Sequence, residues 1–247
     1  EEGWLATSCK PEHGGMGVPT FYQAVTWAEF GTSACMALSV LPALSIGVYE
    51  VLTSHGRQDL IDYFATNLAT GEWAGTMCLT EPHAGTDLGI INTSAEPQSD
   101  GTYKISGTKI FITYGEHDMA DNIVHLVLAK APGGPEGTKG ISLFLVPKYM
   151  PSEWEEGGLE GVSNSLKTEH NGVTCSGTEE KMGLHASPTC VMNFDDSTGW
   201  LVGPLHGGMP LMFEMMNRER VATGMMGLGL AEIAYQNALA WSLERRQ

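Results

Sequence analysis

The chain has 247 residues, of which 42% are hydrophobic and 17% charged, and its formal net charge is −16. This composition is typical of a folded globular protein and excludes an intrinsically disordered one. With 13 Lys and Arg against 29 Asp and Glu, the chain lacks a basic surface for nucleic acid or an anionic membrane. No apolar run reaches the roughly 20 residues of a membrane-spanning helix. Five scattered cysteines without a CxxC pair favour a reducing compartment, and we predict a cytoplasmic protein.

Residues 1–75 carry helical patterns. An apolar stripe at helical spacing runs through the end of this zone, at Leu60, Phe64 and Leu68. Gly71 is expected to end that helix, whereas Pro42 and Gly47 are expected to divide the preceding apolar stretch into separate pieces. We predict the C-terminal part of a helical domain here.

Residues 76–204 change to runs of strand length, among them TYKISGTKIFITY, NIVHLVLAK and GISLFLVP. Asp100-Gly101 lies between two such runs and predicts a hairpin turn. Residues 151–172 have the weakest pattern and predict a surface excursion. We expect a mostly antiparallel β domain.

Residues 205–247 return to a helical period. An unbroken helix from Pro210 to Gln247 would be about 55 Å long at about 1.5 Å per residue. Such a rod is too long for a lone helix on a small sheet, and it predicts one member of a bundle whose other helices lie beyond Gln247. The order of helices, strands and helices indicates an α+β fold, and we expect the chain to be a fragment of a longer protein.

The stretch MCLTEPHAGTDLG (77–89) passes from an apolar strand into polar residues. Pro82 cannot donate a ladder hydrogen bond, so strand pairing should end near it. Gly85 is expected to take a positive φ, and Thr80 and Thr86 offer hydroxyls. The pattern fits either a binding rim at a strand end or an ordinary exit from a strand into a loop.

A phosphate is a poor ligand for this stretch. Glu81 and Asp87 would repel a bare anion, and no obvious helix follows to aim its dipole at the loop. Hydroxyls and amides beside acids suit the edge of a neutral heteroaromatic ring, such as a flavin or a purine. The histidines lack the spacing of metal ligands, and we predict no metal site.

Phe111 and Thr113 form a second candidate. They lie two residues apart on a predicted strand and would share one face. An aromatic plane beside a hydroxyl could hold a stacked ring with one hydrogen-bonding atom. The alternative is ordinary core packing.

Six blocks, in this order, resemble the acyl-CoA dehydrogenase family: MCLTEPHAGTDLG, GTKIFIT, KGISLFLVP, EEKMGLHASPT, WLVG and MNRERVATGMMGLGLAEIAYQNAL. The first block is highly specific, and the others are specific jointly. The segments EPHAGTDLG and GEHDMAD are most similar to a longer bacterial branch that includes broad-range fatty acyl-CoA and methylmercaptopropionyl-CoA dehydrogenases. The resemblance implies a helical N-terminal domain, a β-barrel-like middle domain and a C-terminal four-helix bundle, assembled as homodimers or homotetramers, with FAD between the last two domains.

The resemblance also implies the chemistry. A carboxylate removes the α-proton of an acyl-CoA thioester, the β-hydride passes to flavin N5, and the product is a trans-2-enoyl-CoA. An electron-transfer flavoprotein then takes the electrons. An acyl-CoA oxidase that uses oxygen, and a non-catalytic relative that serves as a binding or assembly subunit, are the two alternatives.

Carried onto this sequence, the resemblance implies flavin contacts from Met77, Leu79, Thr80, Gly85, Thr86, Phe111 and Thr113. It further implies substrate contacts from Thr86, Asn217 and Arg220. Three positions depart from the family pattern: Phe111 replaces a commoner Trp, Asn217 replaces an acid, and Ile90 replaces a small residue.

The catalytic base has two candidate positions by this resemblance. Most members use a glutamate that would lie beyond Gln247, and some use a glutamate directly before an arginine on the first long helix. Glu219-Arg220 occupies the second position. Glu219 is therefore either the base or a solvated helix acid paired with Arg218, Arg220 or a neighbouring helix. The resemblance favours the paired acid, because the branch that this chain resembles looks like one that uses the distal glutamate.

Overall fold

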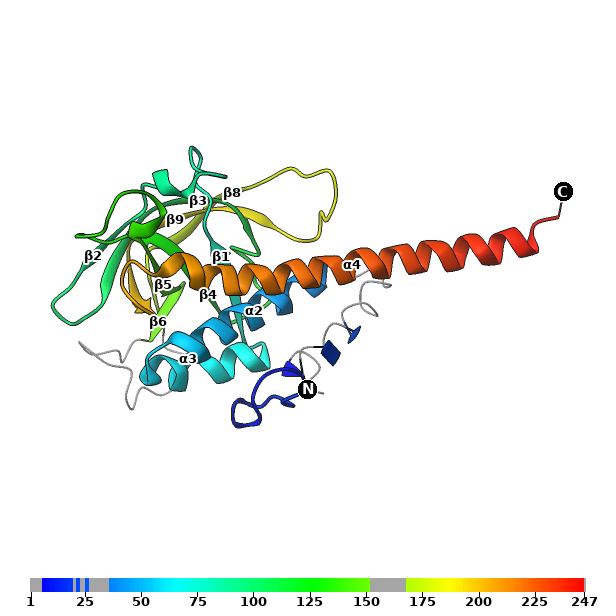
Figure 1. Ribbon diagram of the computed structural model, residues 1–247, viewed down its shortest axis with the longest axis horizontal. Coiled ribbons are helices and arrows are strands. Elements are labelled where there is room, and N and C mark those ends of the chain that lie inside the picture. Colours follow the sequence, from blue (N-terminus) through cyan, green and yellow to red (C-terminus); the bar gives the residue numbers. More distant parts are fainter. Residues whose placement is uncertain (1–5, 20, 23–24, 27–35, 152–167, 247) are drawn as a thin grey trace.

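The computed structural model describes residues 6–19, 21–22, 25–26, 36–151 and 168–246 (Figure 1). Most of the predicted surface excursion at 151–172 lies outside these residues. The helices with described bounds are α2 (Met36–His55), α3 (Gln58–Thr70) and α4 (Gly208–Glu244). The strands are β1 (Trp73–Cys78), β2 (Ser94–Pro97), β3 (Tyr103–Thr113), β4 (Asn122–Lys130), β5 (Ile141–Pro147), β6 (Tyr149–Pro151), β7 (Thr168–His170), β8 (Val173–Thr178) and β9 (Thr189–Val202). The fold is α+β, as the sequence predicts.

The main sheet closes on itself. β4 pairs with β2 and β5, β3 pairs with β2 and β9, and β9 pairs with β5, so these pairings form a ring. Most pairs are antiparallel, but β4 runs parallel to both β1 and β2. The sheet is therefore mixed and barrel-like, and its closure leaves few unpaired strand edges.

A single helix, α2, runs through Pro42 and Gly47, so the prediction that these residues divide the segment is wrong. Pro42 removes one backbone donor, but tertiary packing against β1, α3 and α4 supports the helix around it. Gly47 is required for packing: a Cβ there would lie 2.9 Å from Cγ of Met215 on α4. The glycine lets α4 approach α2 closely.

The predicted stripe on α3 is confirmed. Its three members are buried in the core between the helices and the sheet, and Gly71 ends the helix at φ 82°. Phe64 packs edge-on against Trp73 and Trp200, with ring centroids 5.5 and 5.8 Å apart. The Asp100-Gly101 turn is also confirmed, because it joins the antiparallel strands β2 and β3.

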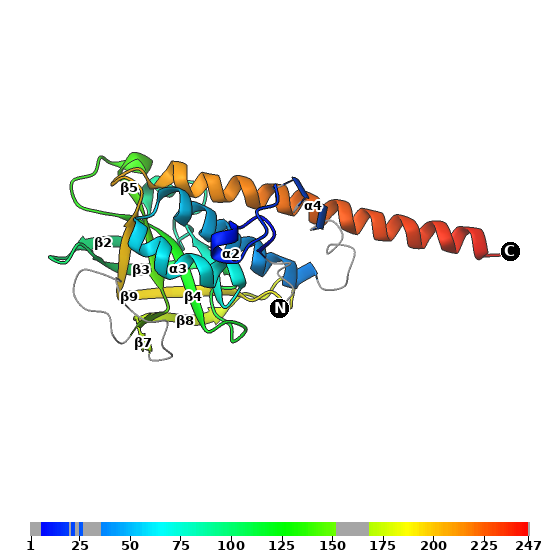
Figure 2. The same ribbon diagram turned by 90° about the horizontal axis from the view of Figure 1, so that it is seen from below.

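α4 is one unbroken helix of 37 residues. Its first part packs on α2 and β5, and its remainder projects away from the rest of the molecule (Figures 1 and 2). Large apolar side chains are exposed along it, at Val221, Leu228, Leu230, Ile233, Tyr235, Leu239, Trp241 and Leu243. None of the helices in the described part of the chain is long and apolar enough to span a bilayer.

Candidate functional site

The first candidate residues lie at the end of β1, on the face of the sheet that the helices cover. Met77 and Leu79 belong to the core between sheet and helices, whereas Cys78 faces the barrel interior. This alternation follows from the two-residue period of a strand. Met77 is half-buried at the end of β1, and Thr80 follows where the strand pairing stops.

The loop after β1 is a tight turn rather than a glycine turn with a positive φ. Glu81 and Ala84 exchange two backbone hydrogen bonds of 3.0 Å, which closes the turn around Pro82. Gly85 is absent from the residues with positive φ, so that prediction is wrong: the turn at Glu81–Ala84 reverses the chain before Gly85 is reached. Gly85 and Thr86 are exposed beyond it.

β3 bends at the second candidate. Lys109 pairs with Met192, but Ile112 pairs with Cys190, so one extra residue is accommodated on β3 as a bulge. Phe111 takes the positive φ of 60° that the bulge requires, and its side chain is 57% exposed. Thr113 is half-buried. Core packing therefore does not explain Phe111, which presents its ring outside the barrel.

The two candidate segments lie beside each other. The Ile110 amide donates to the Thr80 carbonyl at 2.8 Å. Within the described residues, no hydrogen bond involves the hydroxyls of Thr80, Thr86 or Thr113. An exposed aromatic ring next to a strand end with spare hydroxyls fits the edge of a planar heteroaromatic ring, which is what a flavin presents.

Beneath these segments lies a buried ion pair. Lys109 Nζ is 2.9 Å from Glu81 Oε1, and the side chains are 0% and 3% exposed. From the sequence, Glu81 is expected only to repel a bare anion, and Lys109 is not identified as a candidate. One signal was available: Lys109 falls on the same strand face as the apolar Ile105, where a two-residue alternation predicts a buried side chain.

Glu219 lies on α4 and shares a cleft with Met77 of β1. A cleft of about 310 Å³ is lined by Met77, Met216, Glu219, Arg220 and Thr223. Glu219 Oε1 is buried and has no hydrogen-bond partner among the described residues. Burial raises the pKa of Glu219 from its ordinary 4.5 to about 7, although the Arg218 charge opposes the shift.

Glu219 is therefore not a solvated acid: the described residues show no hydrogen bond between its buried Oε1 and an arginine, although the Arg218 charge acts on it. Arg218 instead donates to Glu50 on α2 and to Ser8 Oγ, the latter at 3.2 Å. Arg220 donates to Asn217 Oδ1 at 3.0 Å and lies over the Phe213 ring. The helical period explains the difference: Arg218 and Glu219 point inward, while Asn217 and Arg220 point toward solvent.

The structure brings some of the predicted residues together and separates others. Met77, Glu219 and Arg220 share the cleft. Leu79, Thr80, Phe111 and Thr113 belong to the two adjoining segments, with Gly85 and Thr86 on the loop between them. Asn217 is exposed on α4 and does not line the cleft. Met216 and Thr223 line it and were not predicted.

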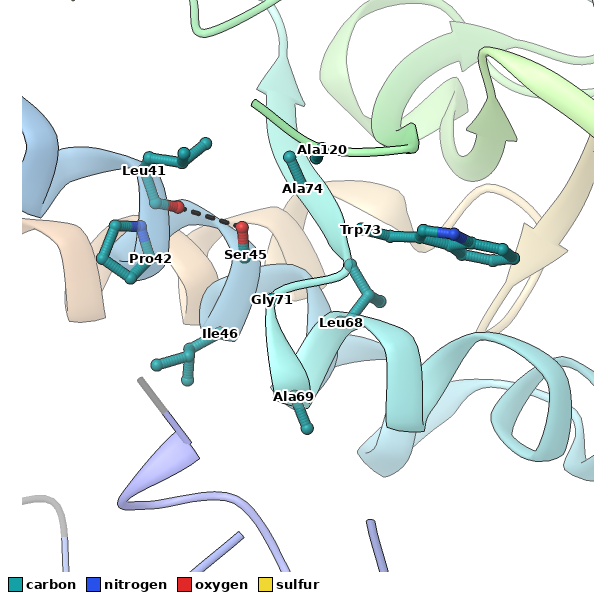
Figure 3. Close-up of a pocket in the computed structure, with 10 residues that line it drawn as sticks. All are labelled: Leu41, Pro42, Ser45, Ile46, Leu68, Ala69, Gly71, Trp73, Ala74 and Ala120. Atoms are coloured by element: carbon teal, nitrogen blue, oxygen red, sulfur yellow. Dashed lines mark hydrogen bonds between the residues drawn. The ribbon is translucent and has the colours of Figure 1, made fainter. Parts of the chain in front are cut away.

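A second pocket lies between α2, α3 and β1 (Figure 3). Its volume is about 40 Å³, close to the space of one or two waters. Ser45 Oγ at its wall donates to the Leu41 carbonyl and accepts from the Gly75 amide, each at 3.0 Å. The pocket is a packing gap beside a helix-to-strand connection and is too small for a cofactor.

Comparison with known proteins agrees with this geometry. Residues 76–197 match the family model for the acyl-CoA dehydrogenase middle domain. The chain is 45% identical over 245 residues to 3-methylmercaptopropionyl-CoA dehydrogenase of Ruegeria pomeroyi, covering 99% of this chain and 40% of that protein. The chain belongs to the acyl-CoA dehydrogenase family.

Other members of the acyl-CoA dehydrogenase family are also similar over nearly the whole of this chain. The broad-specificity linear acyl-CoA dehydrogenase FadE5 of Mycobacterium tuberculosis is 37% identical, over 100% of this chain and 39% of that protein. The solved butyryl-CoA dehydrogenase of Megasphaera elsdenii superposes with a TM-score of 0.79 at 25% identity, over 99% of this chain and 59% of that chain. The chain thus spans about two fifths of the length of these two curated relatives.

Proposed function

We propose that this chain is the part of an FAD-dependent acyl-CoA dehydrogenase that contacts the flavin and the reacting carbons of the thioester. The observation that carries the proposal is the cleft lined by both Met77, near the end of β1, and Glu219, whose Oε1 is buried without a hydrogen-bond partner among the described residues. Family membership supports the reaction class, and the names of the relatives support an acyl-CoA substrate.

The residues present fit FAD. Thr80 and Phe111 provide a hydroxyl and an exposed ring at adjoining positions, with the buried Leu79 beneath them, and Thr86 and Thr113 add hydroxyls. When bound, FAD supplies a two-electron acceptor for the hydride that leaves the β-carbon. Met77 and Met216 line the cleft with flexible apolar side chains that exclude water from the reacting carbons.

Glu219 is the proton acceptor that the described residues offer. Its buried oxygen is not committed to another group, and its pKa of about 7 places the carboxylate where a general base works near neutral pH. Arg220 lines the same cleft and supplies a positive charge for the thioester or its CoA portion. A glutamate of the complete protein beyond Gln247 is the alternative base.

The function is tested with the complete protein by comparing electron acceptors. We expect turnover of a short linear acyl-CoA with an electron-transfer flavoprotein or an artificial dye, and little hydrogen peroxide under air. Rapid peroxide release in step with enoyl-CoA formation would assign the oxidase alternative. Absence of bound flavin and of FAD uptake would contradict both, and would leave a binding or assembly role.

The base is tested by Glu219→Gln in the complete protein. If Glu219 removes the α-proton, the rate of flavin reduction falls by about 10²- to 10⁴-fold, as expected for loss of a general base. Glu214→Gln is a matched control on the same helix, because Glu214 is exposed and pairs with His55 at 2.8 Å outside the cleft. Equal rates for the two variants would assign the base to a residue beyond Gln247.

A further inference from the structure

We propose that Glu81 and Lys109 are positioning residues that hold the strand end at Thr80 and the bulge at Phe111 in fixed relation, so that both segments meet one flavin ring. The inference rests on the proposed function, since it assigns these segments to the cofactor. Neither Glu81 nor Lys109 lines the cleft itself.

Lys109 connects the two segments from within. Its side chain is fully buried, and Nζ donates to the Leu79 carbonyl at 3.0 Å and to Glu81 Oε1 at 2.9 Å. The two acceptors flank Thr80 in the sequence, and Lys109 itself stands two residues before Phe111. The Ile110 amide adds its bond to the Thr80 carbonyl. A displacement of either segment would therefore break a charge-assisted hydrogen bond in a dry environment.

Glu81 extends the connection to the far side of the loop. Its Oε2 accepts from the Asn92 amide at 2.7 Å, and its Oε1 accepts from the Thr93 amide at 3.0 Å and the Thr93 hydroxyl at 2.5 Å. Although burial acts in the opposite direction, these hydrogen bonds and the Lys109 charge hold the pKa of Glu81 below its ordinary value. One carboxylate thus anchors the entry of the loop to its exit, with Gly85 and Thr86 between them.

Stability alone is a weak reason for this arrangement. A buried ion pair recovers little more than its own desolvation penalty, and well-packed apolar residues of similar volume serve a core as well or better. What apolar residues cannot do is fix two backbone segments through directed bonds to the Leu79 carbonyl and the Asn92 and Thr93 amides. The Glu81–Lys109 pair is therefore suited to fixing the two segments relative to each other.

The test separates positioning from packing in the complete, flavin-loaded protein. Lys109→Met alone leaves a buried carboxylate without its counter-charge, and both thermal stability and FAD retention should fall.

The double variant Glu81→Leu with Lys109→Met removes both charges. We expect it to be more thermally stable than Lys109→Met, because no unpaired charge stays buried, while the rate of flavin reduction by saturating acyl-CoA stays about 10- to 100-fold lower, as for other misplaced reacting groups. The visible circular dichroism of the bound flavin should also change.

A matched control is Lys148→Met, which breaks the partly buried Lys148–Glu116 pair (2.5 Å); neither residue belongs to the two segments or bonds to Glu81 or Lys109 among the described residues. It should lower stability without changing the flavin spectrum.

If the double variant regains stability, spectrum and reduction rate together, the pair is only structural and the inference is wrong. If the double variant does not fold, Glu81→Gln is measured by the same criteria. A wild-type protein that neither binds nor reduces FAD would instead overturn the proposed function, and the inference with it.

Discussion

Glu219 should make the stability of this chain depend on pH. Its folded pKa of about 7 lies above its ordinary 4.5, so the folded state holds a proton that the unfolded state releases between these values. The stabilisation is full below about pH 4.5 and is lost as pH rises to about 7, a change of about 3 kcal/mol in the free energy of unfolding. Urea unfolding at pH 5 and pH 7.5 measures it.

Glu219→Gln separates this contribution from those of other titrating groups. The variant should be nearly as stable as the wild type at pH 5 and more stable than it at pH 7.5, because glutamine never ionises. Glu214→Gln, which alters an exposed acid, should follow the wild type at both values. A wild-type difference between pH 5 and 7.5 that persists in Glu219→Gln would contradict the assigned burial.

For single residues, the sequence predicts which side chains belong to the site better than it predicts their burial and backbone conformation. It identifies Phe111 and Thr113 as a candidate pair, but not the bulge that turns Phe111 outward, because a bulge depends on the partner strand β9. It predicts a special turn at Gly85, whereas hydrogen bonds between Glu81 and Ala84 make it. It does not reveal that Glu81 is buried, and it favours a solvated Glu219, because burial of a carboxylate depends on residues distant in the sequence.

Among the elements, α4 has two parts with different packing. Leu211 is 6% exposed in the core against α2 and the sheet, whereas Leu228 is 56% exposed on the projecting part. Leu211→Ala should lower the free energy of unfolding by about 2–5 kcal/mol through lost burial and a cavity. Leu228→Ala, the matched change on the same helix, should alter it by less than about 0.5 kcal/mol in this chain. Chemical denaturation of the two variants checks the difference.

In a longer protein that contains the proposed helical bundle, the expected result for Leu228 changes. If further helices cover the projecting part of α4, as the proposed bundle requires, Leu228→Ala becomes destabilising there while Leu211→Ala remains so. A neutral Leu228→Ala in both forms would contradict the bundle at this position.

The element boundaries show where local patterns suffice. The stripe on α3, its end at Gly71 and the long period of α4 are local, and the structure confirms them. The continuity of α2 through Pro42 and Gly47 is not local, because the contact with Met215 that favours glycine comes from a helix about 170 residues later. Helix propensity was overridden by packing.

For the molecule as a whole, the α+β order and the strand-rich middle could be predicted, but the pairing could not. The parallel contacts of β4 with β1 and β2 join segments whose sequences carry no mark of their partner. The arrangement of the candidate site could not be predicted for the same reason. The end of β1, the bulge of β3 and the first part of α4 come together only when the chain folds. The family blocks located these segments, and the fold shows how they adjoin.

The most direct measurement is a single anaerobic turnover of the complete protein with a short linear acyl-CoA. We predict loss of the visible absorbance of bound flavin and formation of trans-2-enoyl-CoA in equal amounts. Flavin that stays oxidised in the presence of bound acyl-CoA, with no enoyl-CoA formed, would contradict it.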